Sequence, residues 1–184
     1  MTRTTSHLLL LLGFALAPAI GAAQAPQMPT PGPEHALLKE DVGTWDATIE
    51  VLMPGAPPGT SAGVEVNTLG CGGLCLSTEF KGTVMGAPFQ GAGVTTWDPQ
   101  KKVYVGSWSD SMTAGLALSE GTWDAAKKTM SATMLTPDGA GGTVKLRSVV
   151  EYTPDGKRVF SLFMPGPDGK DVPSMRITYA RQKK

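Results

Sequence analysis

Histidine and cysteine are scarce in this 184-residue chain, and neither sign of charge is in excess. It has two histidines, two cysteines and 16 basic against 16 acidic side chains. Nucleophilic enzymes usually need a histidine base, and haem-binding barrels need a histidine in the barrel itself. After residue 25 the sequence has only His35, in a predicted helix. The even charge also argues against nucleic-acid binding, which needs a basic surface.

The first 25 residues have the pattern of a cleavable export signal. Arg3 precedes an uncharged run from residue 8 to residue 23, and Ala23-Gln24-Ala25 is an A-x-A cleavage site. The apolar run is too short for a comfortable membrane span. We therefore expect cleavage after Ala23 or Ala25 and a periplasmic or secreted protein. Residues 26–33 are rich in proline and predict a tether ahead of one domain at 34–184.

The two cysteines lie close together, with Gly72-Gly73-Leu74 between Cys71 and Cys75. In an oxidising compartment such a pair is most simply a disulfide. The alternative is a metal site, but no histidine or further cysteine is near it. The two glycines fit a tight hairpin turn, which would place the cysteines diagonally across two strands.

The rest of the chain predicts an all-β fold after one short helix at 33–42. From residue 43 the period changes to two, and Trp45, Ala47, Ile49, Val51 and Met53 share one face. Turn signals of the Pro-Asp-Gly type then recur at short intervals. The expected strands are 43–53, 62–70, 74–83, 87–97, 102–110, 114–123, 128–136, 142–152, 157–164 and 171–181. With an even number of strands the first and last can pair, so we expect a closed up-and-down antiparallel barrel.

Gly43-Thr44-Trp45, after a short helix, resembles the lipocalin-like (calycin) superfamily, in which a G-x-W on the first strand meets a basic residue on the last. Arg181 is the matching residue, with Arg176 as the fallback. The sequence resembles more widely a bacterial group, domain-of-unknown-function family 1579, through Gly32-Pro33-Glu34-His35, Gly43-Thr44-Trp45-Asp46, Gly86-Ala87-Pro88-Phe89-Gln90-Gly91, Trp108-Ser109-Asp110 and Tyr179-Ala180-Arg181. The resemblance implies a barrel but no reaction. It predicts that Trp45 packs under Arg181 at the helix-covered end.

Alternating strands place six of the methionines at the other end of the barrel, the mouth. These are Met53, Met85, Met112, Met134, Met164 and Met175, and Trp108 and Asp110 fall near the same end. Methionine is flexible and polarisable, so this pattern indicates an apolar rim that admits a small apolar or amphipathic molecule. Two alternatives remain: methionines that only fill gaps where strands stop, and thioethers that converge to hold Cu(I).

The leading functional hypothesis is therefore an exported binding barrel, with no cofactor implied. The first alternative is an enzyme that uses interior carboxylates, with Asp110 and Glu120 as the candidates. The second is a structural or partner-binding domain whose barrel is filled by side chains. The size of the interior distinguishes a binding barrel from a filled one.

Overall fold

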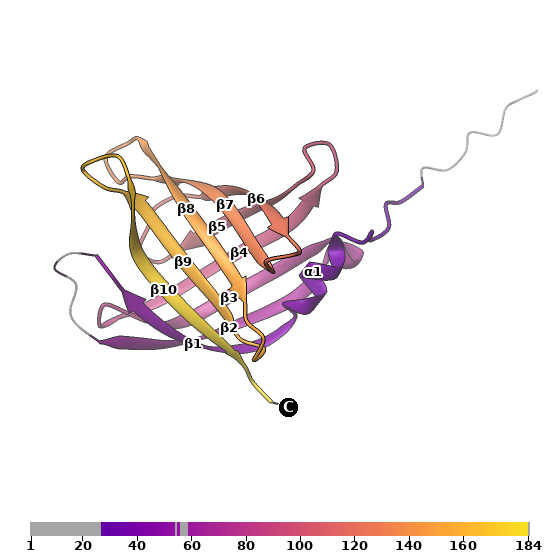
Figure 1. Cartoon of the computed structure of the whole chain (residues 1–184), viewed down its shortest axis with the longest axis horizontal. Helices are drawn as coiled ribbons and strands as arrows, with labels where there is room; N and C mark the ends of the chain where they lie inside the picture. The colour runs from indigo at the N-terminus through magenta and orange to yellow at the C-terminus, as the bar shows by residue number, and fades with distance from the viewer. Residues whose placement is uncertain (1–26, 54, 56–58, 184) are drawn as a thin grey trace, which may run out of the picture.

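Ten antiparallel strands follow one another around a closed ring (Figure 1). The computed structural model describes residues 27–53, 55 and 59–183, so the predicted signal peptide lies outside the described residues. The elements are α1 (His35–Glu40), β1 (Gly43–Val51), β2 (Thr60–Gly70), β3 (Cys75–Val84), β4 (Ala87–Asp98), β5 (Val103–Asp110), β6 (Ala117–Asp124), β7 (Thr129–Pro137), β8 (Thr143–Tyr152), β9 (Arg158–Pro165) and β10 (Asp171–Arg181). Each strand pairs with its neighbours in sequence, and β10 pairs with β1 to close the ring. The predicted barrel is confirmed.

Two of the element boundaries that differ from the sequence-based expectation have a structural reason. The helix ends at Glu40, because the carbonyls of Glu40 and Val42 accept hydrogen bonds from the Arg181 guanidinium. Strand β6 begins at Ala117, three residues later than expected. The chain turns at Gly115, whose φ is +125° and whose carbonyl accepts a bond from Ser109 Oγ at 3.1 Å. In the part of the chain that is described, no helix is long and apolar enough to cross a membrane.

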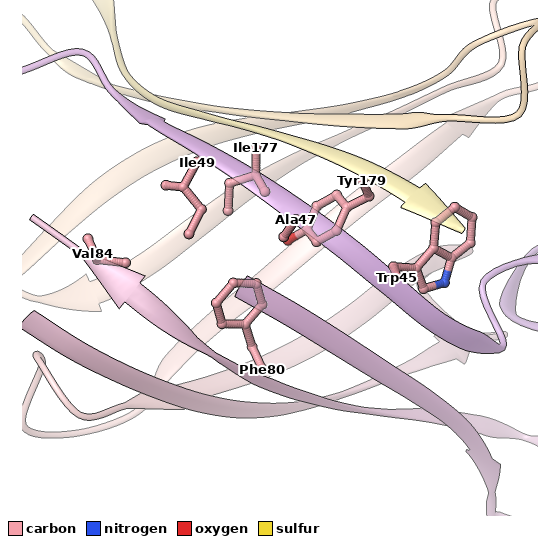
Figure 2. Packing of buried hydrophobic residues seen from close by; sticks show 7 residues of the cluster. All are labelled: Trp45, Ala47, Ile49, Phe80, Val84, Ile177 and Tyr179. Carbon is pink, nitrogen blue, oxygen red and sulfur yellow. The ribbon is translucent and has the colours of Figure 1, made fainter. Parts of the chain in front are cut away.

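A cluster of buried apolar residues lies on the side of the barrel formed by β1, β3 and β10 (Figure 2). The cluster consists of Trp45, Ala47, Ile49, Phe80, Val84, Ile177 and Tyr179. Its register follows from the β1–β10 ladder, in which Ala47 pairs with Tyr179 and Ile49 pairs with Ile177. Gly63 makes room for the Phe80 ring, since a Cβ there would lie 2.3 Å from Phe80 Cζ. The predicted apolar face of β1 is therefore the core face.

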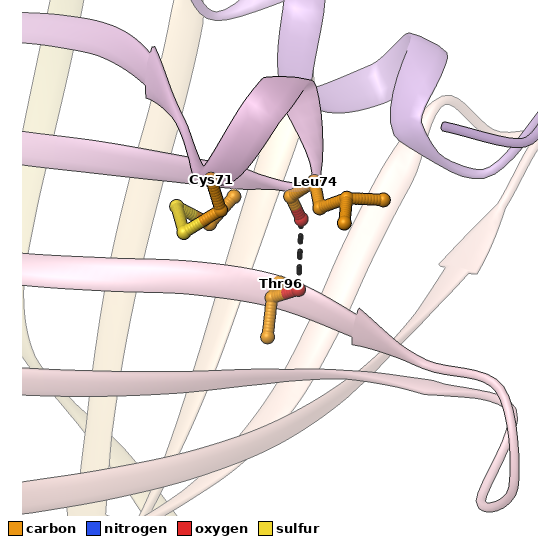
Figure 3. Close-up of a disulfide and its surroundings, with 4 residues drawn as sticks. Cys71, Leu74 and Thr96 are labelled. Carbon is orange, nitrogen blue, oxygen red and sulfur yellow. Dashed lines mark hydrogen bonds between the residues drawn. A yellow bond between two sulfur atoms is a disulfide. The ribbon is translucent and has the colours of Figure 1, made fainter. Parts of the chain in front are cut away.

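The turn between β2 and β3 carries the disulfide (Figure 3). Cys71 and Cys75 are bonded, with Cα atoms 5.5 Å apart, so the predicted disulfide is confirmed. The predicted diagonal placement across two strands is wrong. Cys71 lies in a short 3-10 turn, Cys71–Gly73, with φ +53°, and only Cys75 is in a strand, opposite Gly70. Thr96 Oγ1 donates to the Leu74 carbonyl at 2.8 Å and ties this turn to β4.

Helix α1 covers one end of the barrel, which we call the floor (Figure 1). Its Leu37 and Leu38 are buried against Leu76 and Tyr104, with Trp97 and Trp123 packed beside them. The Tyr104 hydroxyl donates to the Glu34 carbonyl at 2.7 Å. Trp97 and Trp123 thus lie at the floor, and the opposite end is the mouth.

Candidate functional site

The barrel encloses a cavity of about 550 Å³. On one side the strands present small residues to it: Thr95, Gly106, Ser119, Gly121, Ala132 and Ser148. Cross-strand pairing brings these residues side by side, with Gly106 opposite Ser119 and Ala132 opposite both Gly121 and Ser148. We call this surface of β4 to β8 the small wall. The interior is hollow here because the side chains are too short to reach its centre.

The facing side of the cavity is bulky and apolar. It is lined by Ile49, Val51, Phe80, Val84, Phe89, Phe160, Leu162 and Ile177. Trp108 extends this apolar surface from β5. Its ring lies directly on Gly91 and Gly93 of β4, where a Cβ would come within 2.2 Å and 2.9 Å of ring atoms. These two glycines therefore make room for the indole.

Five of the six methionines assigned to the rim line the cavity. Met53, Met85, Met112, Met134 and Met175 all line the cavity, and Met85 and Met112 are 45% and 55% exposed at the mouth. Met164 does not line it, so its prediction is wrong. The β8–β9 ladder ends at Phe163, and Met164 lies beyond it, opposite Val172, where only the β9–β10 hairpin continues. Met130, which the sequence analysis did not select, lines the cavity nearer the floor.

The two carboxylates proposed as acid and base are not paired in the structure. Asp110 lines the cavity near the mouth, where its Oδ2 accepts the Trp108 Nε1–H at 3.0 Å. Its Oδ1 accepts the backbone N–H groups of Met112 and Thr113, so it caps the turn after β5. Glu120 points outward and pairs with Lys101, because it is out of phase with the inward residues of β6. The prediction of Glu120 as an interior carboxylate is wrong.

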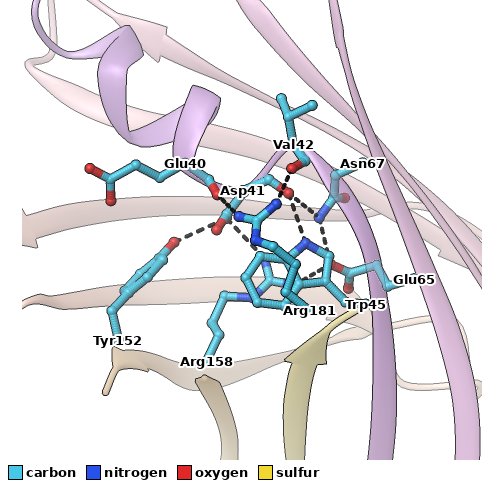
Figure 4. A network of polar contacts seen from close by, with 9 residues as sticks. All are labelled: Glu40, Asp41, Val42, Trp45, Glu65, Asn67, Tyr152, Arg158 and Arg181. Atoms are coloured by element: carbon cyan, nitrogen blue, oxygen red, sulfur yellow. Dashed lines mark hydrogen bonds and ion pairs between the residues drawn. The ribbon is translucent and has the colours of Figure 1, made fainter. Parts of the chain in front are cut away.

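The floor of the cavity is a buried ionic cluster centred on Arg158, the first residue of β9 (Figure 4). Its guanidinium contacts Asp41 Oδ2 at 2.9 Å and makes a short ion pair with Glu65. The side chains of Arg158 and Glu65 are 8% and 9% exposed. The Tyr152 hydroxyl donates to Asp41 Oδ2 at 3.0 Å, and Asn67 Nδ2 donates to Glu65 at 2.7 Å. Both carboxylates are therefore held by neighbours within the protein.

Aromatic rings complete this floor. The Arg158 guanidinium lies 4.6 Å from the centre of the Trp45 ring and 4.5 Å from that of Tyr179. Arg181 also lies over Trp45, at 4.1 Å, and pairs with it across the β1–β10 ladder. Each such contact contributes about 0.5–2 kcal/mol, depending on desolvation. The expected contact of Trp45 with Arg181 is present, and the same indole carries a second guanidinium that was not expected.

Burial changes the ionisation of this cluster. It raises the pKa of Asp41, an effect that the nearby Arg158 charge partly offsets. Burial opposes the charged form of Arg158, but Asp41 and Glu65 outweigh it and raise the pKa of Arg158. The pKa values of the Tyr152 and Tyr179 hydroxyls also rise, mainly through burial and then through the charges of Asp41 and Glu65 respectively. Both tyrosines therefore stay protonated in the folded protein.

Sequence reasoning missed Asp41, Glu65 and Arg158. The available signal for Arg158 was its phase, because it alternates with Phe160 and Leu162, which face inward. Strand β2 is inverted relative to the usual pattern, with Glu65 and Asn67 buried while Val64 and Val66 are 37% and 40% exposed. A prediction that places the valines of β2 inside the barrel would therefore exchange the inward and outward faces of this strand.

Among the residues that the structure describes, no histidine and no cysteine lines the cavity. His35 is buried beside the helix, where its Nδ1 accepts the Gly32 N–H at 3.0 Å. Within residues 27–53, 55 and 59–183, no three His, Cys, Asp or Glu side chains are grouped so as to hold a metal ion. The site is therefore an apolar chamber with fixed charges at its floor and, at its mouth, the carboxylate of Asp110, which caps a turn.

The fold and the cavity define a closed ten-stranded antiparallel barrel with a hollow interior. The chain belongs to the family described as "Protein of unknown function (DUF1579)", whose sequence profile matches residues 30–181. Comparison with curated proteins finds no match. Among solved structures, Rv2717c from M. tuberculosis is similar, with 14% identity and a TM-score of 0.61 over 83% of this chain and 99% of that one.

A second similar structure is the S-type phycobiliprotein lyase CPES from Guillardia theta. It has 12% identity and a TM-score of 0.55, over 82% of this chain and 93% of that one. Likeness at such low identity shows the barrel fold and nothing more specific.

We predict that Arg158→Met lowers the free energy of unfolding by about 3–5 kcal/mol, because it leaves two carboxylates buried without their cation. Arg147→Met is the control, since Arg147 is an outward arginine on the neighbouring strand whose side chain is 42% exposed. That change should cost less than about 1 kcal/mol. Urea denaturation measures both. Equal losses in the two variants would show that the cluster is not buried as described.

All three tyrosines of the chain, Tyr104, Tyr152 and Tyr179, have raised pKa values in the folded protein. The unfolded chain releases these protons at about pH 10, so stability is full below that pH and falls as pH rises above it. The ultraviolet absorbance of tyrosinate should therefore appear together with the loss of folded circular dichroism. Tyrosinate that forms while the folded signal persists would contradict the burial.

Proposed function

We propose that this protein binds a small apolar or amphipathic molecule inside its barrel. The observation that carries the proposal is the cavity of about 550 Å³, apolar on one side and rimmed by exposed methionines. Ligand sites are concave, mostly apolar and usually about 300–1,000 Å³ in volume. The methionine side chains at the mouth can repack around ligands of different shape.

The small wall supports binding over a purely structural role. A barrel that is stabilised only by its own side chains fills its interior to the density of an organic crystal. Here Gly106, Gly121 and Ala132 face the interior together and leave it open. The empty space gives up packing that larger residues would supply, which is expected of a site that receives a ligand.

The carboxylates of the cavity do not support an acid–base enzyme. Asp110 already accepts three hydrogen bonds, and Asp41 and Glu65 are paired with Arg158. A general base must reach the proton it removes and be free to accept it. Binding is therefore the function that this geometry favours.

We further propose that the protein acts outside the cytoplasm, in the periplasm or as a secreted protein. The export pattern of the first 25 residues supports this, as does the Cys71–Cys75 disulfide, because disulfides persist mainly in oxidising compartments. Inside the cytoplasm such a bond would be reduced.

We predict that Ala132→Phe weakens binding of the neutral fluorophore N-phenyl-1-naphthylamine on the order of tenfold, a loss of about 1.4 kcal/mol. The added ring would occupy the space above the small wall. Ser131→Phe places the same ring on the exposed outer face of β7 and should leave the affinity unchanged. Fluorescence titration measures the affinities, and thermal unfolding confirms that both variants fold. Equal affinities in the two variants would place the binding outside the cavity.

Expression of the full chain in a bacterial host tests the location. The protein recovered from the periplasm or medium should have the intact mass of a chain cut after Ala23 or Ala25, less the two hydrogens of the disulfide. Treatment with a reductant should restore those two hydrogens. A full-length mass in the cytoplasmic fraction, with two free thiols, would overturn the proposed location.

A further inference from the structure

The charges that line the cavity are not balanced. The lining contains three carboxylates, those of Asp41, Glu65 and Asp110, and one cation, the guanidinium of Arg158. No lysine lines it. With all four groups ionised, the chamber has two negative charges in excess.

The single cation is not available to an anionic ligand. Arg158 already faces one carboxylate through each of its terminal nitrogens, Nη1 to Asp41 and Nη2 to Glu65. Its remaining flat surface lies over the Trp45 and Tyr179 rings. A ligand carboxylate would have to displace a buried protein carboxylate in order to reach either terminal nitrogen, and that displacement costs the pairing energy of a desolvated ion pair. The Nε–H, which makes no hydrogen bond within the described residues, is itself buried.

The second arginine at the floor does not reverse this balance. Arg181 is exposed, lies outside the set of lining residues, and donates to the carbonyls of Glu40 and Val42. Solvent screens an exposed charge strongly. Even if burial keeps Asp41 protonated, Glu65 and Asp110 still outnumber Arg158. The sign of the excess charge therefore does not depend on the ionisation of one residue.

The site near the mouth adds a feature that suits a cation. The Trp108 ring lines the cavity, and the Asp110 carboxylate lies at its edge, bonded to Nε1. The face of an indole attracts cations through its quadrupole, and a nearby carboxylate adds to that attraction. A cationic group that enters between the methionines meets this pair first.

We propose that the barrel selects uncharged or cationic amphipathic molecules and rejects fatty-acid-type anions. This inference rests on the proposed binding function and deepens it by naming the ligand class. The apolar body of the ligand packs between the small wall and the bulky wall. A cationic head, where present, stays near Trp108 and Asp110 at the mouth.

The test compares three ligands that share one chain and differ only in the head group: dodecyltrimethylammonium, dodecanol and dodecanoate. Each is tested for displacement of N-phenyl-1-naphthylamine from the protein at neutral pH, with the two ionic ligands below their micelle concentrations and the alcohol below its solubility limit. We expect the cation to bind on the order of tenfold more tightly than the anion, with the alcohol between them, as a net negative charge of one or two in a partly screened cavity predicts. Dodecanoate that binds as tightly as the cation would overturn the proposal.

A matched pair of variants assigns the selectivity to the cavity. Asp110→Asn removes one negative charge from the lining while its Oδ1 can still cap the turn. Asp98→Asn makes the same change at a turn of the same type, where Asp98 Oδ1 accepts the N–H groups of Gln100 and Lys101 but does not line the cavity. Only Asp110→Asn should reduce the ratio of cation to anion affinity, by severalfold. An equal reduction in both variants would contradict the proposed role of Asp110.

The outcomes separate the two proposals. If the fluorophore and all three ligands fail to bind, the proposed binding function fails. If the fluorophore and the alcohol bind, and Ala132→Phe weakens them, binding stands. In that case, an affinity for dodecanoate equal to that for the cation would contradict only the proposed charge selectivity.

Discussion

The ion pairs of Arg158 hold together parts of the barrel that are distant in sequence. One guanidinium joins Asp41 at the end of α1, Glu65 on β2 and the rings of Trp45 and Tyr179 on β1 and β10. Removing such charges from water is costly, and the mutual attraction repays that cost only when every partner is in place. The helix can therefore close the floor only in one position, and the cavity above it receives a fixed polar base.

The two sides of the interior differ in packing: side chains fill one side and leave the other open. The packed cluster on β1, β3 and β10 buries aromatic and branched residues, of which Ile49 is only 1% exposed. The small wall across β4 to β8 leaves the space in which a ligand would lie. Gly91 and Gly93 contribute to packing, because they allow Trp108 to lie flat against the sheet. A barrel of ten strands is wide enough for both arrangements to coexist.

The sequence predicted the strands well because alternation and turn residues are local signals, and they agreed along most of the chain. The disulfide was equally local. The site was harder, because the sequence does not show which charged residues meet across the barrel. Arg158 and Glu65 are 93 residues apart, and Glu65 sits on a strand whose valines face outward. The prediction for Glu120 was wrong because its strand has few apolar residues to mark the inward face. The prediction for Met164 was wrong because the pairing of β9 with β8 stops at Phe163, which the sequence of β9 alone does not show.

The closure of the ring by β1 and β10 has a consequence for how the chain reaches its folded state. Arg181 bonds the carbonyl of Glu40, 141 residues earlier in the chain, so the ring is complete only when the two extremes of the domain meet. Contacts of such long range make folding slow. Until β10 is in place, β1 and β9 both present open edges that can pair with another copy of the chain. The last strand thus protects the barrel against self-association, and a chain that stopped before Asp171 would lose this protection together with Ile177 and Tyr179 of the core cluster.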